Sequence, residues 1–287
     1  MIIYRSTFQL LRFHFSFFLM PVYWFALSQL VQPDPGRALL VFIILHVVIY
    51  PSSNGFNSYM DRDEGSIGGL KTPLPPTRQL LRVSLFMDLL SLLLGLIISV
   101  YFALAAALYI LASRAYSHRS VRLKKYPLTG FLTVMICQGA LVFFMVYHGA
   151  HRHLSLQVPI LGMISASLLI GGFYPLTQVY QHVADAKDGV ITISAKLGIR
   201  GTFIFCSVVY GVAFSVLAIF FGISLETKEF LILSTCMLPV LVYFILWGIR
   251  VWRNPSYADF RHTMWMNIIA SVFTSLGFIL VFLMQYF

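Results

Sequence analysis

The chain has 287 residues, of which 59% are hydrophobic and only 10% are charged, and its mean hydropathy is +0.84. A water-soluble fold of this size needs far more polar surface, so the composition excludes a soluble protein and predicts a polytopic membrane protein. The net charge of +10 does not indicate nucleic-acid binding, because the basic residues lie in the short segments between apolar runs, where they set topology and meet anionic lipid headgroups.

Nine apolar runs are each long enough to cross about 30 Å of hydrocarbon as a helix. We therefore predict an all-α fold with nine transmembrane helices around a central pocket, in a single membrane-embedded domain over residues 1–287. The third and fourth runs have almost no polar break between them, so their boundary could lie elsewhere. In chain order the predicted spans lie near residues 13–32, 37–57, 80–98, 99–113, 128–148, 158–180, 202–223, 229–250 and 264–286.

The Lys and Arg residues predict how these helices are oriented. Of the 20 basic residues, all but Arg37, Arg152 and Lys228 fall on one side of the predicted spans. The positive-inside rule places that side and the N-terminus in the cytoplasm, and the C-terminus outside. We expect the bilayer to be the inner cell membrane.

Two short polar stretches follow the second and sixth predicted helices on the cytoplasmic side. Each contains an amide, an acid four residues later, and another acid three residues after that. At 3.6 residues per turn these offsets fall within about 60° of one another around a helix. The two triplets are Asn57, Asp61 and Glu64, and then Gln181, Asp185 and Asp188.

Acidic residues at membrane depth are energetically expensive and are usually functional. Two facing clusters of oxygen ligands predict a site for Mg²⁺ that carries a phosphorylated substrate. Asp63 points away from the shared helical face and is a second-choice ligand. Nearby basic side chains would bind the phosphate oxygens. The predicted metal ligands are Asn57, Asp61, Glu64, Asp185 and Asp188.

Three segments resemble motifs of the UbiA-type intramembrane prenyltransferases. Residues 57–64, followed by Lys71-Thr-Pro-Leu-Pro75, resemble the first aspartate-rich motif of that family, and residues 185–198 resemble the second. Tyr116-Ser117, with Leu123-Lys124 following, resembles the characteristic loop after the fourth helix. The resemblance implies a nine-helix fold entered from the cytoplasm, Mg²⁺ as cofactor, a polyprenyl diphosphate donor, and a lipophilic acceptor that we expect to be aromatic.

The chain departs from the family pattern at Gly65 and Gln181, where the family usually has aspartate. The number of Mg²⁺ ions therefore stays open. We expect Glu64 and Asp188 to supply the missing oxygens, with Gln181 as a neutral ligand or hydrogen-bond partner. The expected catalytic residues are Asp61, Asp185, Lys124 and Tyr116, and the expected donor-binding residues are Asn57, Lys71, Lys187, Gln181 and Arg62.

Other functions share parts of this pattern. A membrane terpene cyclase would use the same metal site, so the motifs do not separate it from a transferase. A cation-coupled transporter is less favoured, because the acids lie at helix ends beside basic loops and not in broken helices near the middle of the bilayer. The oligomeric state is open.

Two further polar features have competing interpretations. His148, His151 and His153 suggest a di-iron site, but they are predicted to lie on the opposite side from the acids and supply too few ligands. Asp88, inside the third predicted helix, is equally compatible with an interhelical hydrogen bond and with a position in the pocket.

Overall fold

The computed structural model describes residues 3–286, and the regular elements in this range are helices, apart from one isolated bridge between Ile67 and Leu70. Within that range nine helical stretches are long and apolar enough to cross a membrane. The predicted all-α, nine-span architecture is therefore confirmed. The stretches are Arg5–Ser28, Pro35–Asp61, Arg78–Ile98, Val100–Ser117, Pro127–Ala150, Ile160–Gln178, Ile193–Ile223, Thr227–Arg253 and Phe260–Met284.

Several spans are assembled from more than one helical element. Elements η2 and η4 are π-helical, whereas η1 and η5 are 3₁₀-helical. In chain order the elements are α1 (Arg5–Leu11), η1 (Phe13–Leu19), α2 (Met20–Ser28), α3 (Pro35–Phe42), η2 (Ile43–Ile49), α4 (Tyr50–Asp61), α5 (Arg78–Ile98), α6 (Val100–Ser117), η3 (Leu123–Lys125), α7 (Pro127–Met135), η4 (Ile136–Leu141), α8 (Val142–Ala150), α9 (Ile160–Phe173), η5 (Tyr174–Gln178), α10 (His182–Lys187), α11 (Ile193–Ile223), α12 (Thr227–Arg253), η6 (Pro255–Tyr257) and α13 (Phe260–Met284).

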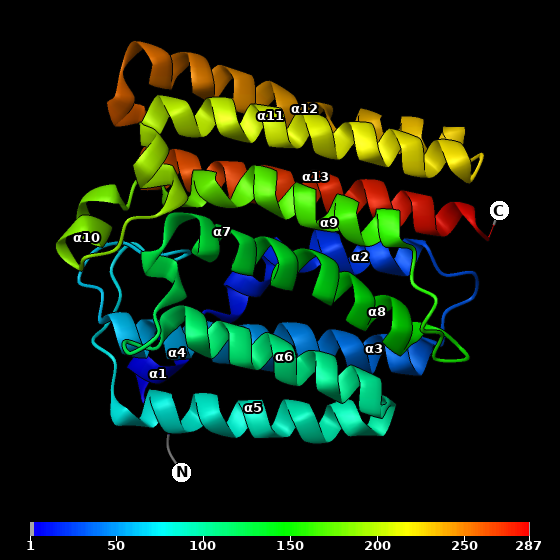
Figure 1. Ribbon diagram of the computed structural model, residues 1–287, viewed down its shortest axis with the longest axis horizontal. Coiled ribbons are helices and arrows are strands. Elements are labelled where there is room, and N and C mark those ends of the chain that lie inside the picture. The colour runs from blue at the N-terminus through cyan, green and yellow to red at the C-terminus, as the bar shows by residue number, and fades with distance from the viewer. Residues whose placement is uncertain (1–2, 287) are drawn as a thin grey trace.

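The long helices lie side by side along the long axis of the molecule (Figure 1). Helix α10 and the loop after α4 gather at one end, and the C-terminus lies at the other (Figure 1). The last span packs on the first through α13 and α2, and Ser271 donates a hydrogen bond of 3.4 Å to the carbonyl of Phe18. Contact between the first and last spans closes the helices around a common interior.

The uncertain boundary between the third and fourth spans lies at a single residue. Ser99 is extended (φ −169°, ψ 161°), and its hydroxyl accepts a hydrogen bond of 3.0 Å from the backbone N–H of Phe102. This N-cap ends α5 and starts α6 without a loop, as predicted. Helix α6 continues to Ser117, past the predicted end at residue 113, and therefore includes Arg114.

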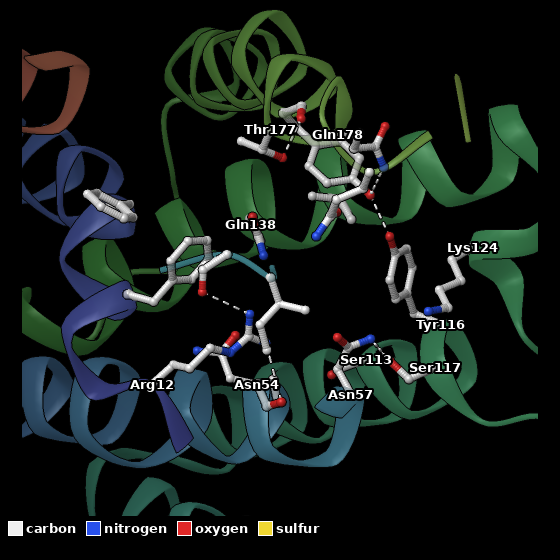
Figure 2. Close-up of a pocket in the computed structure, with 18 of the residues that line it drawn as sticks. Arg12, Asn54, Asn57, Ser113, Tyr116, Ser117, Lys124, Gln138, Thr177 and Gln178 are labelled. Atoms are coloured by element: carbon white, nitrogen blue, oxygen red, sulfur yellow. Dashed lines mark hydrogen bonds between the residues drawn. The ribbon is translucent and has the colours of Figure 1, made fainter. Parts of the chain in front are cut away.

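Close packing of η4 on α9 fixes the wall of the interior. A Cβ atom on Gly139 would lie 2.3 Å from the Cα of Ser167, so only glycine fits there. The Ser167 hydroxyl accepts a hydrogen bond of 2.9 Å from the N–H of Ala140. This contact holds the π-helical turn and directs Gln138 toward the interior (Figure 2).

Asp88 has a structural role, which answers the question left open by the sequence. Its carboxylate accepts hydrogen bonds from Ser52 (2.6 Å) and from Nε of Arg114 (2.9 Å). The Arg114 guanidinium also lies over the Phe56 ring, 4.1 Å from its centroid. The group ties α4, α5 and α6 together away from the pocket described below.

Candidate active site

A polar pocket of about 270 Å³ lies among the helices, and its lining includes Asp185 of α10 and Lys124 of η3. Asn57, Asp61 and Asp63 line it from the first motif, and Gln181 and Asp185 line it from the second. The two aspartate-rich segments, far apart in the sequence, therefore meet around one cavity.

The first motif follows the predicted helical face only as far as Asp61. Helix α4 ends there because Arg62 adopts a left-handed backbone conformation (φ 55°). The chain then turns, so that Asp63 lines the pocket whereas Glu64 is exposed and outside it. The expected position of Glu64 on one face with Asn57 and Asp61 is wrong, because that face requires a helix that continues.

The second motif is also less helical than the sequence predicted. Helix α10 covers only His182–Lys187, with Gln181 before it and Asp188 after it. Gln181 lines the pocket and donates a hydrogen bond of 3.2 Å to the Ser66 carbonyl, which joins the two motif loops. Asp188 does not line the pocket; it pairs with Arg122. The backbone N–H groups of Asp185 and Asp188 bond the carbonyls of Gln181 (2.8 Å) and Ala184 (3.2 Å), so the helical pattern continues across the motif, but the expected place of Asp188 among the pocket ligands is wrong.

Two cations approach the first motif from the loop after α6. Nζ of Lys124 lies 2.5 Å from Oδ2 of Asp61, and the guanidinium of Arg122 lies 3.8 Å from Oδ1. The side chains of Lys124 and Asp61 are only 11% and 5% exposed. Oδ1 of Asp61 is buried and has no hydrogen-bond partner among the described residues, so Arg122 meets it only as a more distant ion-pair partner.

Two carboxylates of the pocket that lie outside the membrane-spanning segments, Asp185 and Asp63, are shifted toward their protonated forms. Burial raises the pKa of Asp185 to about 6, and the nearby Asp63 and Asp61 add to the rise, although Lys124 opposes it. Burial also raises the pKa of Asp63, with a further contribution from Asp61. Crowded, partly dehydrated carboxylates favour binding of a cation that neutralises them.

A tyrosine network also lines the pocket. The hydroxyl of Tyr116 is hydrogen-bonded to that of Tyr174, which accepts a hydrogen bond of 2.8 Å from Nε2 of Gln178 (Figure 2). Asn57 donates a hydrogen bond of 3.0 Å to the Ser117 hydroxyl and is thereby held in place. Phe173 completes an aromatic wall beside the polar end of the pocket.

Arg12 is a pocket residue that the sequence analysis missed. It has a left-handed backbone conformation (φ 48°) between α1 and η1, and its side chain bonds the carbonyls of Gly68 (3.2 Å) and Asn54 (3.3 Å). The first predicted span began near residue 13, which left Arg12 in the segment before it. In the structure the helix begins at Arg5, and Arg12 faces the protein interior (Figure 2).

Three predicted donor-binding residues do not reach the pocket. Lys71, Lys187 and Arg62 are exposed, and none of them lines it. Each lies in a loop or at a helix end beside the motifs, so proximity in sequence overstated its proximity in space.

The oxygen ligands fit a Mg²⁺ ion that is shared with a bound phosphate. Within residues 3–286 no three His, Cys, Asp or Glu side chains stand close enough to form a complete metal cage. Mg²⁺ is usually bound by one or two carboxylates together with substrate phosphates and water, so a complete protein cage is not required. The pocket meets this requirement for one or two carboxylates, because it is lined by Asp61, Asp63 and Asp185.

Comparison with known proteins agrees with this architecture. The chain is similar to the structure of a UbiA homologue from Archaeoglobus fulgidus bound to DMAPP and Mg²⁺, with 19% identity, a TM-score of 0.73, and coverage of 96% of this chain and 99% of that one. The same homologue bound to GPP and Mg²⁺ has 18% identity, a TM-score of 0.70, and coverage of 96% and 99%. An apo UbiA homologue from Aeropyrum pernix K1 has 18% identity, a TM-score of 0.68, and coverage of 93% and 97%.

No curated protein sequence matches the chain significantly. The model of the UbiA prenyltransferase family matches residues 18–284, nearly the full length of the chain. The chain therefore belongs to the UbiA prenyltransferase family.

Proposed function

We propose that this membrane protein transfers a prenyl group from a polyprenyl diphosphate to a lipophilic, aromatic acceptor, with Mg²⁺ as cofactor. The observation that carries the proposal is the meeting of Asp61, Asp63 and Asp185 with Lys124 and Arg12 in one pocket. The Archaeoglobus fulgidus homologue, which shares the fold, binds DMAPP or GPP together with Mg²⁺.

In this proposal the carboxylates of Asp61, Asp63 and Asp185 hold the metal, and the side-chain oxygens of Asn57 and Gln181 assist. The ion, when bound, neutralises the charge that develops on the leaving diphosphate. Glu64 and Asp188 are left out of the ligand set because they do not line the pocket.

Lys124 and Arg12 bind the phosphate oxygens of the donor. Both line the pocket, and their donors supply charge-assisted hydrogen bonds. They replace Lys71, Lys187 and Arg62, which are exposed.

The reaction breaks the bond between the allylic carbon and the diphosphate oxygen, and the bonding electrons leave with the diphosphate. The acceptor forms a new bond to the allylic carbon and then loses a proton. Tyr116, Phe173 and Tyr174 exclude water from the allylic cation, and their ring faces stabilise its charge. We further propose that the pocket faces the cytoplasm, with the N-terminus on that side of the inner membrane.

The test is diphosphate release by the purified protein in detergent. Geranyl, farnesyl and geranylgeranyl diphosphates are each supplied with Mg²⁺ or with chelator, with and without a panel of phenolic acceptors, and products are identified by mass. Release that requires both Mg²⁺ and an acceptor supports the transferase. Mg²⁺-dependent release without acceptor, with a hydrocarbon or terpene alcohol as product, identifies a cyclase instead, and no release under any condition contradicts the proposal.

A further inference from the structure

The polar pocket extends from the two motifs toward the middle of the membrane-spanning region. Along α4 it is lined at intervals of three or four residues by Asp61, Asn57, Asn54 and Tyr50. Asp61 lies eleven residues after Tyr50 in this helix, which is about 16 Å along the axis of an α-helix. A diphosphate and its metal at Asp61 would therefore occupy only the end of the pocket nearest the motifs.

Three polar side chains line the pocket at its far end, and we call them the polar floor: Tyr50 of α4, Tyr109 of α6 and Gln138 of η4. Each is the pocket-lining residue of its span that lies farthest from the end carrying the motifs. The ring centroids of Tyr50 and Tyr109 lie 6.0 Å apart, and Gln138 lies close to the Tyr109 hydroxyl. Three helices thus bring hydroxyl and amide groups to one place.

The hydroxyl of Tyr50 has no hydrogen-bond partner within residues 3–286, although the residue is only 2% exposed. A buried hydroxyl without a partner costs free energy, and phenylalanine would fill the same space without that cost. Packing alone therefore does not account for a tyrosine here. A hydroxyl or carbonyl of a bound ligand would supply the missing partner.

The polar floor carries no charge. The charged residues that line the pocket, among those the structure describes, are Arg12, Asp61, Asp63, Lys124 and Asp185. Under the proposed function the two cations bind the diphosphate. An anionic group at the floor would then be buried without a counter-charge, which is strongly unfavourable.

We propose that the polar floor binds an uncharged hydroxyl or carbonyl of the acceptor, and that the acceptor is a neutral phenol or quinol and not an aromatic acid. This inference rests on the proposed function and restricts its acceptor to one chemical class. A ring held at the floor by one oxygen presents its other side to the allylic carbon, which lies nearer the motifs.

The experiment compares two phenols of nearly equal size and shape, 4-hydroxyacetophenone and 4-hydroxybenzoate, which at neutral pH are uncharged and anionic, respectively. Their binding to the purified protein in detergent is measured by ligand-observed NMR titration. Mg²⁺ and dimethylallyl thiolodiphosphate, a non-reactive donor analogue, are present throughout. We expect the wild-type protein to bind the ketone at least about tenfold more tightly, because the carboxylate loses its hydration without gaining a counter-charge.

Tyr50→Phe tests the floor, and Tyr59→Phe is its matched control. Tyr59 belongs to the same helix, but it packs against the apolar cluster around Leu80 and does not line the pocket. Tyr50→Phe should weaken binding of the ketone by roughly threefold to tenfold. It should not lower the unfolding temperature of the ligand-free protein, because it removes an unpartnered hydroxyl. Tyr59→Phe should leave the affinity for the ketone unchanged, and both variants should keep the wild-type affinity for the thiolodiphosphate.

The outcomes separate this inference from the proposed function. Equal or tighter binding of 4-hydroxybenzoate by the wild-type protein overturns the inference, and so does full affinity of Tyr50→Phe for the ketone. A matching loss of thiolodiphosphate affinity in Tyr50→Phe overturns it too, because the donor site would then be affected. If the thiolodiphosphate binds with Mg²⁺ but neither phenol does, the inference fails while the proposed donor site stands. Failure of the wild-type protein to bind the thiolodiphosphate overturns both proposals.

Discussion

Lys124 and Asp61 form a buried ion pair, with Nζ 2.5 Å from Oδ2, between the loop after α6 and the end of α4. Each charge is costly to bury alone, so the pair holds both side chains at the polar pocket before any ligand arrives. Under the proposed function each of the two groups takes a new partner when the donor binds. Lys124 then contacts phosphate, and Asp61 contacts the metal.

Asp61→Asn should reduce Mg²⁺-dependent diphosphate release by roughly 100-fold or more, because an amide oxygen does not neutralise a divalent cation. The measurement is steady-state release, with the unfolding temperature in detergent as a check on folding. Glu64→Gln removes a carboxylate three residues away that is exposed and outside the pocket, and it should retain activity. Equal losses in both variants would contradict the ligand set.

Lys124→Met should raise the Kd for a prenyl thiolodiphosphate by about tenfold to a hundredfold, because it removes a charge-assisted hydrogen bond. The matched control is Lys125→Met, since Lys125 is exposed and lies over the Tyr126 ring, 5.5 Å from its centroid. Binding is measured directly, so the result is independent of the acceptor. Unchanged affinity in Lys124→Met would exclude this lysine from the phosphate site.

Binding of Mg²⁺ with the diphosphate analogue should weaken as the pH falls through about 6. Burial raises the pKa of Asp185 to about 6, so near that pH the free protein carries a proton that the metal must displace. Calorimetry in buffers of different ionisation enthalpy should detect proton release. In Asp185→Asn the release should be smaller, and an undiminished release there would contradict the assignment.

The same shift has a consequence for the stability of the metal-free protein. An acid whose pKa is higher in the folded than in the unfolded state stabilises the fold below the unfolded pKa. That contribution is lost as the pH rises toward about 6, the folded value for Asp185. Unfolding temperatures of wild type and Asp185→Asn should therefore diverge over this interval, with wild type falling as the pH rises.

Asp88→Ala should destabilise the fold by about 3–5 kcal/mol, because it leaves the Arg114 guanidinium buried without its carboxylate partner. Diphosphate binding per folded molecule should not change, since Asp88 does not line the polar pocket. The unfolding temperature in detergent measures the first effect. Asp88→Leu combined with Arg114→Leu removes both charges and should recover much of the lost stability.

The sequence predicted the number and order of the spans because hydrophobic length determines which segments can cross a bilayer. The break at Ser99 lies where the predicted spans 80–98 and 99–113 meet, although the sequence left that boundary open. The site was harder to predict, because the helical-face argument assumes a helix that continues. Arg62 ends α4 in a left-handed conformation, and Glu64 then leaves the shared face while Asp63 enters the pocket.

Contacts between distant segments account for the other differences. Arg12 looked like an interfacial charge, and only the fold brings it to the carbonyls of Gly68 and Asn54. Arg114 looked like a loop residue, and only helix packing pairs it with Asp88. The hydrophobic periodicity of one segment does not show which distant residues its charged side chains will contact.

At the end of the molecule opposite the motifs, hydrogen bonds join the loops to one another. The N–H of Asp34 bonds the Ala150 carbonyl (2.8 Å), the Arg37 guanidinium bonds that of Arg152 (2.7 Å), and His148 bonds Ser99 (2.7 Å). None of these residues lines the polar pocket. These bonds join the loop before α3, the break between α5 and α6, and the loop after α8, so the spans are cross-linked by residues that take no part in the polar pocket.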